Sequence, residues 1–466
     1  MIIFSAQVEL AFLVLDIRKT PRYTMPGRTQ PSSLYREHSD EHDFIQRYSI
    51  SENGFLPERE PLKRLPSPYY EPWECLLDHL PSLIKKKTIR KAVENTQVLS
   101  TRKIHTEEEW RRAYVVLSFL AHAYIWGGEK ASEVLPSAIS VPFLQVSEYL
   151  DLPPVATYAA LNLWNFACSG SDFQELDRLE ALHTFSGTQD ESWFFSVSVA
   201  MEAQGAYIIP VMLRALSAVE YRDYSTITRA LDELTVCIGK LGELLDRMDE
   251  KCNPMVFYHE IRPYLAGSKN MGAAGLPNGV LYQDGDGSIS WKQLRGGSNG
   301  QSSLIQFLDA ALGVVHKSSG HNAHTRHAGS FGTSGVATAF HQEVRSYMPG
   351  PHREFLEHVS NMKSLKELAN EPGESDEQRR LRRSFHFATE ALGDFRNRHV
   401  QLVTRYIIVP SRKQSDVSTV NLATASSRSN QDPGRELTGT GGTALIPFLK
   451  QTRDETYSTG ITSSGV

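Results

Sequence analysis

The fold class of this 466-residue chain is decided by residues 374–410, ESDEQRRLRRSFHFATEALGDFRNRHVQLVTRYIIVP. The apolar residues of this stretch recur every three or four positions, which is the period of one face of a helix. Ser375 and Gln378 have the spacing of a capping box, and Pro410 predicts the end of the helix. The stretch therefore predicts one long amphipathic helix. Its stripe consists of Leu381, Phe385, Ala388, Leu392, Phe395, His399, Leu402 and Tyr406.

His399 is the polar member of this stripe. A histidine on a buried face lowers stability unless its ring nitrogens find hydrogen-bond partners. Two interpretations remain open at this point. In the first, His399 is a core histidine that bonds a nearby carbonyl. In the second, it is the axial ligand of a haem that lies against the helix, because a neutral imidazole on a rigid element suits iron.

The end of this stretch, RNRHVQLVTRYIIVP at Arg396, resembles the haem-ligating helix of the indoleamine 2,3-dioxygenases. The resemblance runs from about Leu56 to about Leu449, and its motifs are long and specific. Further segments resemble the same family in the same order along the chain. They are LPPVATYAALNLWN at Leu152, CNPMVFYHEIRPYLAG at Cys252, GGSNGQSSLIQFLDAALG at Gly296, RSYMPGPHREFL at Arg345 and GTGGTALIPFLK at Gly439.

The helical periodicity and the resemblance together predict a mostly α fold. A small N-terminal helical domain is expected to pack on a larger all-helical haem-binding domain. The predicted divisions are an N-terminal tail or extended arm at 1–55, a small domain that contributes the inner pocket wall at 56–186, and a large helical haem domain at 187–466. Mobile loops are predicted at about 267–302, 317–340 and 411–442, where glycine, serine and threonine are frequent.

Apolar periodicity and capping signals predict further helices. The strongest begins after Thr106, whose three following glutamates suit a helix start, and it ends at Gly127. Strand signals are sparse, and a short hairpin at 280–291 is the main one. The remaining helices are predicted at 73–83, 86–99, 141–150, 154–166, 191–217, 224–248, 254–265, 303–316 and 443–449.

Composition narrows the class of protein. Hydrophobic residues make up 40% of the chain and the net charge is -5, so the chain can bury a large core and has no strongly basic surface for nucleic acid. The four cysteines are scattered and form no C-x-x-C pair, which favours a reducing cytoplasm. The apolar N-terminus lacks a basic segment and contains Glu9, so neither a signal peptide nor a membrane anchor is predicted.

Four histidines, His316, His321, His324 and His327, lie close together in a low-complexity segment. Neighbouring histidines can indicate a metal site, but no carboxylate or cysteine joins them in the sequence. A specific metal site is therefore not predicted here. The single histidines His122 and His183 have no partner at helical spacing and are interpreted as structural.

The resemblance implies oxidative opening of the indole pyrrole ring of L-tryptophan by O2, giving N-formylkynurenine. This reaction begins the kynurenine pathway of tryptophan catabolism, which supplies NAD. The implied cofactor is one haem b per chain, kept reduced by an external reductant. Related indoleamines are further expected substrates. The protein is expected to be cytoplasmic and monomeric, with no nucleic-acid or membrane partner.

The resemblance also assigns residues around the cofactor. His399 matches the proximal ligand of the haem iron, and Asp309 and Arg396 match an acid–base pair that orients this ligand through hydrogen bonds. An ordinary interhelical ion pair is the alternative interpretation of Asp309 and Arg396. Gly297 and Ser298 lie in the glycine-rich segment, where backbone can approach a flat cofactor closely.

Substrate-binding residues are implied in the same way. Arg262 matches the residue that binds the substrate carboxylate, for which a bidentate guanidinium is suited. Tyr258 stands where the family usually has phenylalanine, and Thr440 matches a threonine in a loop that closes over the substrate. No side chain is expected to act as a catalytic base. The other implied substrate-binding residues are Tyr158, Leu161, Asn162, Phe194, Ser198, Phe257, Leu265 and Asn299.

Two alternatives to a tryptophan dioxygenase remain open at the level of sequence. One is a haem-binding sensor or paralogue with weak catalysis, since Leu161 and Asn162 differ from the residues expected in vertebrate members. The other is a helical scaffold without a cofactor, in which His399 is a core residue. Bound haem separates the scaffold from the other two, and turnover separates the enzyme from the sensor.

Overall fold

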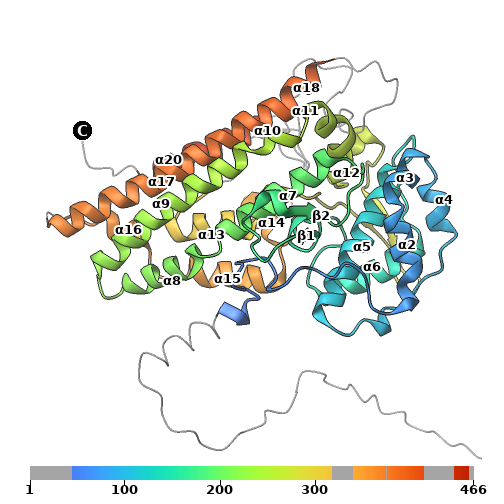
Figure 1. Cartoon of the computed structure of the whole chain (residues 1–466), viewed down its shortest axis with the longest axis horizontal. Coiled ribbons are helices and arrows are strands. Elements are labelled where there is room, and N and C mark those ends of the chain that lie inside the picture. The colour runs from blue at the N-terminus through green and yellow to red at the C-terminus, as the bar shows by residue number, and fades with distance from the viewer. Residues whose placement is uncertain (1–44, 317–339, 374, 414–444, 461–466) are drawn as a thin grey trace, which may run out of the picture. The chain divides into compact units, whose positions relative to one another are not determined.

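The computed structural model describes residues 45–316, 340–373, 375–413 and 445–460. They belong to a single compact unit that begins at Ile45. Helices dominate the described residues, and their strands form two antiparallel sheets of two strands each. The predicted mostly α fold class is therefore confirmed (Figure 1).

The N-terminal part of this unit is built around α5 (Glu107–Trp126), and every residue of α5 from Arg112 to Trp126 is buried. Thr106 caps the helix by accepting from the backbone N–H of Glu109, as the sequence predicts, and Gly127 ends it. Shorter elements surround it (Figure 1). They are η1 (Pro68–Tyr70), α2 (Glu71–Asp78), α3 (Leu80–Lys85), α4 (Ile89–Glu94), η2 (Thr101–Lys103) and α6 (Ser137–Tyr149).

Three long helices lie side by side in the remainder of the unit: α9 (Tyr224–Asp246), α17 (Asp376–Val403) and α20 (Leu445–Gly460) (Figure 1). α17 lies against both of the others, because its apolar stripe is wide enough to face two neighbours. The helices α7 (Gln189–Gln204), α8 (Ile208–Ala218), α10 (Met248–Lys251), α13 (Ser303–Leu312), α14 (Phe340–Arg345), α15 (Gly350–Ser360) and α16 (Leu365–Asn370) complete this part.

The helix predicted at 375–410 is present, and its predicted capping box forms between Ser375 and Gln378. Its predicted end at Pro410 is wrong. After Val403 the backbone widens into a π-helical turn, η8 (Thr404–Ile408), and continues as α18 (Val409–Arg412). Pro410 lies in the first turn of α18, where the missing N–H of a proline would have no partner within that helix.

Other helix predictions also need correction, and the one at 73–83 is divided into α2 and α3. The helix predicted at 191–217 is two helices, α7 and α8, separated at Gly205, where a Cβ would lie 2.3 Å from the Leu304 side chain. The helix predicted at 303–316 ends earlier because Gly313 adopts φ 65°. The helix predicted at 443–449 continues to Gly460 as α20. The helix predicted at 254–265 is divided into α11 (Pro254–Val256), the π-helical η5 (Phe257–Ile261) and α12 (Arg262–Leu265).

The stretch predicted as a helix at 154–166 is mostly not helical. It contains one π-helical turn, η3 (Ala159–Leu163), and then enters β1 (Phe166–Cys168). β1 pairs with β2 (Leu179–Ala181), a sheet that the sequence did not indicate, and η4 (Leu176–Arg178) connects the two. The predicted hairpin is confirmed as β3 (Val280–Gln283) paired with β4 (Ile289–Lys292).

One hydrophobic core runs through the described unit, and it joins Trp73 and Leu117 to Val199 and Tyr406. The predicted domain division at 186/187 stays a prediction, as does the mobility of residues 267–302. That segment contains η6 (Gly272–Ala274), the β3–β4 hairpin and η7 (Asn299–Gln301). The predicted arm up to Phe44 and almost all of the loops predicted at 317–340 and 411–442 lie outside the described residues.

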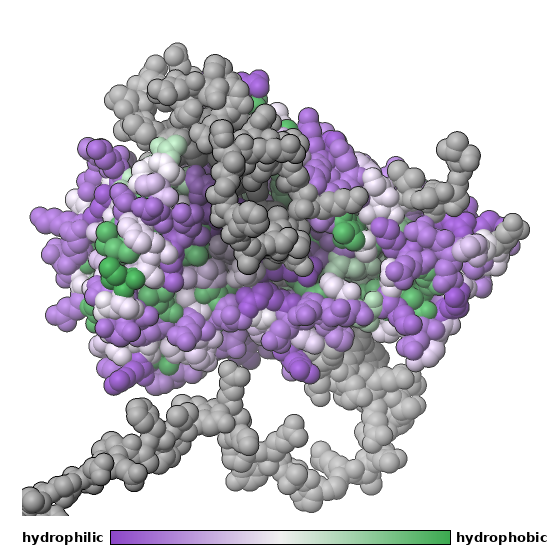
Figure 2. Space-filling model, turned by 180° about the vertical axis from the view of Figure 1, so that it is seen from behind, coloured by the Kyte–Doolittle hydropathy of each residue, from purple (hydrophilic) through white to green (hydrophobic). Residues whose placement is uncertain are grey.

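Polar residues cover most of the face drawn in Figure 2, and apolar residues form small separate patches on it. In the part of the chain that the structure describes, no individual helix has the length and hydropathy of a membrane span. The pair α7 and α8, bent by 42°, meets these criteria only when taken together.

Candidate active site

A cavity of about 240 Å³ is lined by residues of the long helices α9, α17 and α20 and of the turn η3. Its walls come from η3, α7, α9, α10, η5, α12, α13, α17, η8, α20 and the segment 297–302. Most of the lining side chains are apolar, so a ligand in the cavity would be shielded from water. The residues expected from the sequence that line it are Tyr158, Leu161, Asn162, Phe194, Ser198, Phe257, Arg262, Leu265, Gly297, Ser298, Asn299, Arg396 and His399.

His399 lies on the cavity wall, and its imidazole is partly accessible. Burial, with a smaller contribution from the charge of Arg396, lowers the pKa of His399 to about 4, so the ring is neutral at pH 7. None of the described residues hydrogen-bonds this ring. A neutral imidazole with an available nitrogen is the form that binds a metal.

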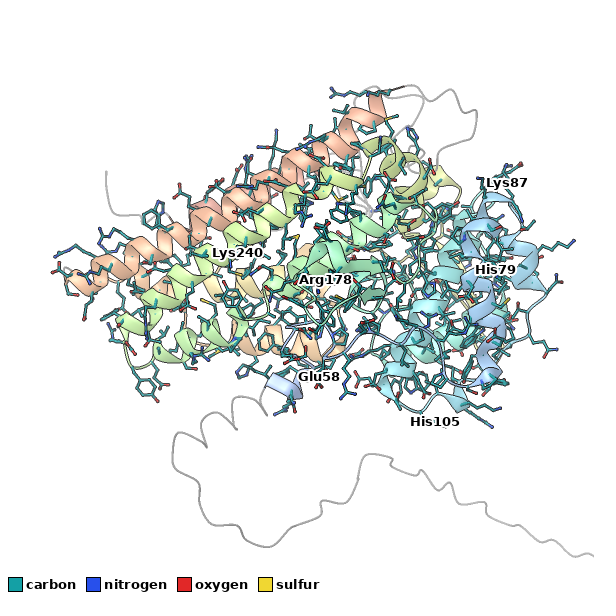
Figure 3. The ribbon with its side chains drawn as sticks, viewed as in Figure 1. Glu58, His79, Lys87, His105, Arg178 and Lys240 are labelled. Carbon is teal, nitrogen blue, oxygen red and sulfur yellow. The ribbon has the colours of Figure 1, made fainter. Side chains whose placement is uncertain are left out.

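Other histidines differ from His399 in their surroundings. His122 is buried, and its two ring nitrogens contact the carbonyl of Tyr264 at 2.7 Å and the N–H of Ala156 at 3.0 Å. His79 and His105 lie on the surface (Figure 3). His122 therefore has the environment of a structural core histidine, as predicted, whereas His399 does not.

Asp309 and Arg396 form a buried ion pair beside the cavity. The Nη2 atom of Arg396 lies 2.7 Å from each carboxylate oxygen of Asp309, and Arg396 also donates to the hydroxyl of Thr456. Arg396 lies one turn before His399 on α17 and lines the cavity, whereas Asp309 lies behind it on α13. The pair therefore links three helices around the residue expected to bind iron.

His316 extends this ion pair toward the C-terminal helix. Its Nε2 lies 3.3 Å from Asp309, and its Nδ1 lies 2.9 Å from Glu455 of α20. The expectation that no carboxylate joins the histidine-rich segment is wrong for His316. The helix that carries Asp309 ends at Gly313, before His316, and Glu455 is 139 positions away, so no local pattern indicates either contact. The other three histidines of that segment lie outside the described residues.

Arg262 is brought to the cavity by the π-helical turn η5 and the short α12. Its side chain is 3% exposed, and its guanidinium lies 5.6 Å from the centre of the Tyr258 ring. Tyr258 is completely buried and lies behind the cavity wall rather than in it. Phe257, on the same turn, does line the cavity and contacts Phe194 with ring centres 4.9 Å apart.

The segment η3 and the glycine-rich residues form a second wall. Gly297 fits against Leu161, since a Cβ at Gly297 would lie 2.4 Å from Leu161 Cδ1. Gln301 fixes the two segments together, because its side chain accepts from the N–H of Tyr158 at 2.8 Å and donates to the carbonyl of Gly296 at 2.9 Å. Thr440, the predicted lid residue, lies outside the described residues.

Gly297→Ala is expected to lower ligand affinity and stability together. The new methyl group can be accommodated only if Leu161 turns into the cavity or the loop moves away, and such overpacking costs about 1–3 kcal/mol. Thermal unfolding and titration with ligand measure both effects. Gly239→Ala on α9, where a Cβ meets nothing within 4 Å, is the matched control. Unchanged values for Gly297→Ala would contradict the tight packing of this wall.

Asn162 adds a polar atom to this wall. Its Nδ2 donates to the carbonyl of Tyr158 at 3.2 Å, whereas its buried Oδ1 has no hydrogen-bond partner among the described residues. Because a buried acceptor without a partner is unfavourable, this atom indicates a place for a ligand or water that donates.

Sequence reasoning missed two groups that line the cavity. The first is Glu202, which lies four residues after Ser198 on the same face of α7, so helical periodicity alone could have found it. The second is the set contributed by α20, a helix that the sequence did not place at the cavity. This set consists of Leu445, Phe448, Leu449 and Thr452.

The described residues fit a haem. The cavity is largely apolar, a neutral histidine without a protein partner lies on its wall, and a glycine at 297 allows backbone to come close. Arg262 supplies positive charge for a carboxylate of such a ligand. No group of three or more histidine, cysteine or carboxylate side chains within the described ranges is arranged to hold a bare metal ion.

Comparison with known proteins agrees with this geometry. The family described as Indoleamine 2,3-dioxygenase matches residues 44–459. The chain is 40% identical over 426 residues to Indoleamine 2,3-dioxygenase nanC of Aspergillus nanangensis, which covers 89% of this chain and 96% of that protein. It is 37% identical over 452 residues to the Indoleamine 2,3-dioxygenase of Saccharomyces cerevisiae, with 92% and 97% covered.

A third relative carries a different name. The 6-hydroxytryptophan 2,3-dioxygenase fscD of Fusarium equiseti is 36% identical over 416 residues, which covers 88% of this chain and 96% of that protein. The match to the family extends over most of the chain and includes every element that forms the cavity. This chain belongs to the indoleamine 2,3-dioxygenase family.

Proposed function

We propose that this protein is a haem-dependent dioxygenase that opens the indole pyrrole ring of L-tryptophan with O2 to give N-formylkynurenine. The observation that carries the proposal is the neutral His399 on the wall of an apolar cavity that also contains Arg262. Family membership supports the same reaction. The sensor and scaffold alternatives lack such a specific observation in their favour.

The proposal includes one haem b per chain, with His399 as its proximal ligand. Bound haem would supply a reduced iron with one coordination position available for O2. The Asp309–Arg396 pair would restrain α17 and thereby the orientation of the His399 ring. Gly297 and Ser298 would lie close to the cofactor, because both line the same cavity.

The protein side chains would bind and orient the substrate. Arg262 would hold the substrate carboxylate, and the aromatic wall of Phe194 and Phe257 would hold the indole ring. The apolar walls exclude water, which strengthens the interaction of Arg262 with its partner. Tyr158, Leu161, Asn162, Ser198, Leu265 and Asn299 would complete the pocket, with Tyr258 supporting it from behind and Thr440 closing it.

The proposal extends to the biological setting. It places the reaction at the start of the kynurenine pathway, in the cytoplasm, with a monomeric protein and an external reductant for iron. Other indoleamines are proposed substrates beside L-tryptophan. 6-Hydroxytryptophan deserves a test among them, because one relative carries that name and Asn162 has an acceptor available in the cavity wall.

The test is a mass measurement of the product made by haem-supplied, reduced protein from L-tryptophan and labelled O2. We expect a product that contains both labelled oxygen atoms. 6-Hydroxytryptophan is assayed in parallel, and haem-free protein serves as the control. A protein that binds haem but yields no product from either substrate would favour the sensor, and a protein that binds no haem would favour the scaffold.

A further inference from the structure

Glu202 is a buried carboxyl group in the cavity wall, and its two oxygens have different surroundings. Oε1 accepts from the hydroxyl of Tyr158 at 3.0 Å and from the hydroxyl of Ser302 at 2.6 Å. Oε2 is buried and has no hydrogen-bond partner among the described residues. The residue is 2% exposed, and it forms no ion pair within the described part of the chain.

This asymmetry is that of a neutral carboxylic acid. The carbonyl oxygen of such an acid accepts hydrogen bonds, as Oε1 does, and the other oxygen carries the proton and needs an acceptor. An ionised carboxylate buried without a cation or a second set of donors would be far less favourable. Oε2 is therefore the atom of Glu202 that is able to donate.

Glu191, on the same helix, shows the contrasting arrangement. It is completely buried as well, but Oε1 accepts from the N–H of Phe185 at 2.9 Å and Oε2 accepts from the N–H of Ser186 at 2.7 Å. Both of its oxygens are used as acceptors, and Glu191 does not line the cavity. Glu202, in contrast, lines the cavity and has one oxygen without a hydrogen-bond partner among the described residues.

We propose that Glu202 is held as a neutral acid and donates a hydrogen bond from Oε2 to a carboxylate of a ligand bound in the cavity. The inference rests on the proposed function, because both ligands of that function, haem and an indole amino acid, carry carboxylates. The proton on Oε2 would lie between Glu202 and the ligand carboxylate. It lets the cavity bind a carboxylate beside an acidic side chain without repulsion between two negative charges. No proton leaves Glu202 in this role.

The titration of Glu202 is separate from that of its neighbours. Burial raises the pKa of Glu202 to about 7, and the hydrogen bonds from Ser302 and Tyr158 oppose this increase. The pKa of Tyr158 is raised well above 10 by burial, and that of His399 is lowered to about 4. The remaining ionisable side chains that line the cavity are Arg262, Arg396 and Tyr406, with Asp309 behind Arg396.

The direct test is infrared difference spectroscopy of the full-length, haem-loaded protein at pH 6, with Glu202→Gln as the reference. We expect the wild-type protein to show the C=O band of a protonated carboxyl group that is absent in Glu202→Gln. The same band should appear in haem-free protein, so this result does not depend on turnover. Absence of the band would overturn the inference even if the protein proves to be an active dioxygenase.

Ligand changes identify the acceptor. If the acceptor is the substrate carboxylate, L-tryptophan shifts the band and tryptamine, which lacks a carboxylate, does not. If the acceptor is a haem propionate, loading with haem shifts the band and loading with the propionate diester of haem does not. A band that none of these ligands shifts would show that Glu202 is a neutral acid with a purely structural role, and would overturn the proposed contact.

Binding as a function of pH provides a second test. The neutral form of Glu202 is lost as the pH rises through about 7, so the affinity for L-tryptophan or haem should fall above this value in the wild type. Glu202→Gln retains a donor that does not titrate, so its affinity should not show this fall. Glu202→Leu should bind about 10-fold more weakly than wild type at pH 6, because it lacks the donor.

Stability supplies a control that is independent of ligand. Since the pKa of Glu202 is higher in the folded state than the usual 4.5, its contribution to the free energy of unfolding decreases as the pH rises from about 4.5 to about 7. The free energy of unfolding of wild type should therefore fall between pH 5 and pH 8, and that of Glu202→Gln should fall less. Burial raises the pKa of Glu191 to about 7 as well, so Glu191→Gln should change the pH dependence of stability in the same direction. It is the matched control for ligand binding, whose pH dependence it should leave unchanged. A Glu202→Gln variant with the wild-type pH dependence would overturn the inference.

Discussion

Replacing His399 by alanine is expected to abolish stable haem binding while the protein still folds. The imidazole makes no hydrogen bond to any described residue, so its removal leaves no buried partner unsatisfied. The loss of haem affinity should exceed the roughly 10–100-fold that removal of an outer hydrogen-bonding partner of a metal ligand costs. Titration of haem-free protein with haem, followed by its absorption spectrum, measures the effect.

Two controls make this result specific. His386 lies on the same helix, on its exposed side, so His386→Ala should bind haem as the wild type does. Added imidazole should occupy the space vacated in His399→Ala and restore the haem spectrum. A wild-type spectrum of His399→Ala without imidazole would refute the assignment of the ligand and favour the scaffold interpretation.

The second large effect is expected at the substrate. Arg262→Ala should bind L-tryptophan more weakly by about 2–5 kcal/mol, the range for truncating one partner of a buried charge pair. The guanidinium is 3% exposed and lines the cavity, so water cannot substitute for its charge as it would at the surface. Equilibrium titration of the haem-loaded variant with L-tryptophan measures the loss.

Tryptamine separates a carboxylate contact from a general change in the pocket. Because tryptamine lacks the carboxylate, its affinity should be nearly the same in Arg262→Ala and wild type. Arg262→Lys keeps the positive charge but lacks the planar guanidinium, so its affinity for L-tryptophan should lie between those of Arg262→Ala and wild type. An equal loss of affinity for tryptamine would show that Arg262 supports the wall by packing on Tyr258 and does not hold the carboxylate.

Local signals in the sequence were sufficient to predict features that depend on residues close together in the chain. The caps of α5 and α17 were predicted correctly because a capping residue and its partner are only three positions apart. The π-helical turns η3, η5 and η8 were not predicted. Each lies where chain segments far apart in the sequence pack around the cavity, and tertiary packing there overrides helical periodicity.

In the candidate site, too, contacts between residues far apart in the sequence could not be predicted. The identity of His399, Arg262 and the glycine-rich residues came from the resemblance to a family, and the structure shows them around one cavity. The contact between His316 and Glu455 joins residues 139 positions apart, and no local pattern indicates such a pair. Helical periodicity places Glu202 on the same face of α7 as Ser198, but a glutamate on a helix is usually solvated, and this argued against a place in the cavity wall.

The position of α20 in the cavity wall has a consequence for biosynthesis. α20 contributes Leu445, Phe448, Leu449 and Thr452, and it is bound to α17 through Arg396–Thr456 and Asp394–Tyr457 contacts. A ribosome makes this helix after all the other elements that line the cavity. A nascent chain therefore exposes the side of α17 that faces α20 until residues 445–460 have emerged, and the cavity wall is complete only after that point.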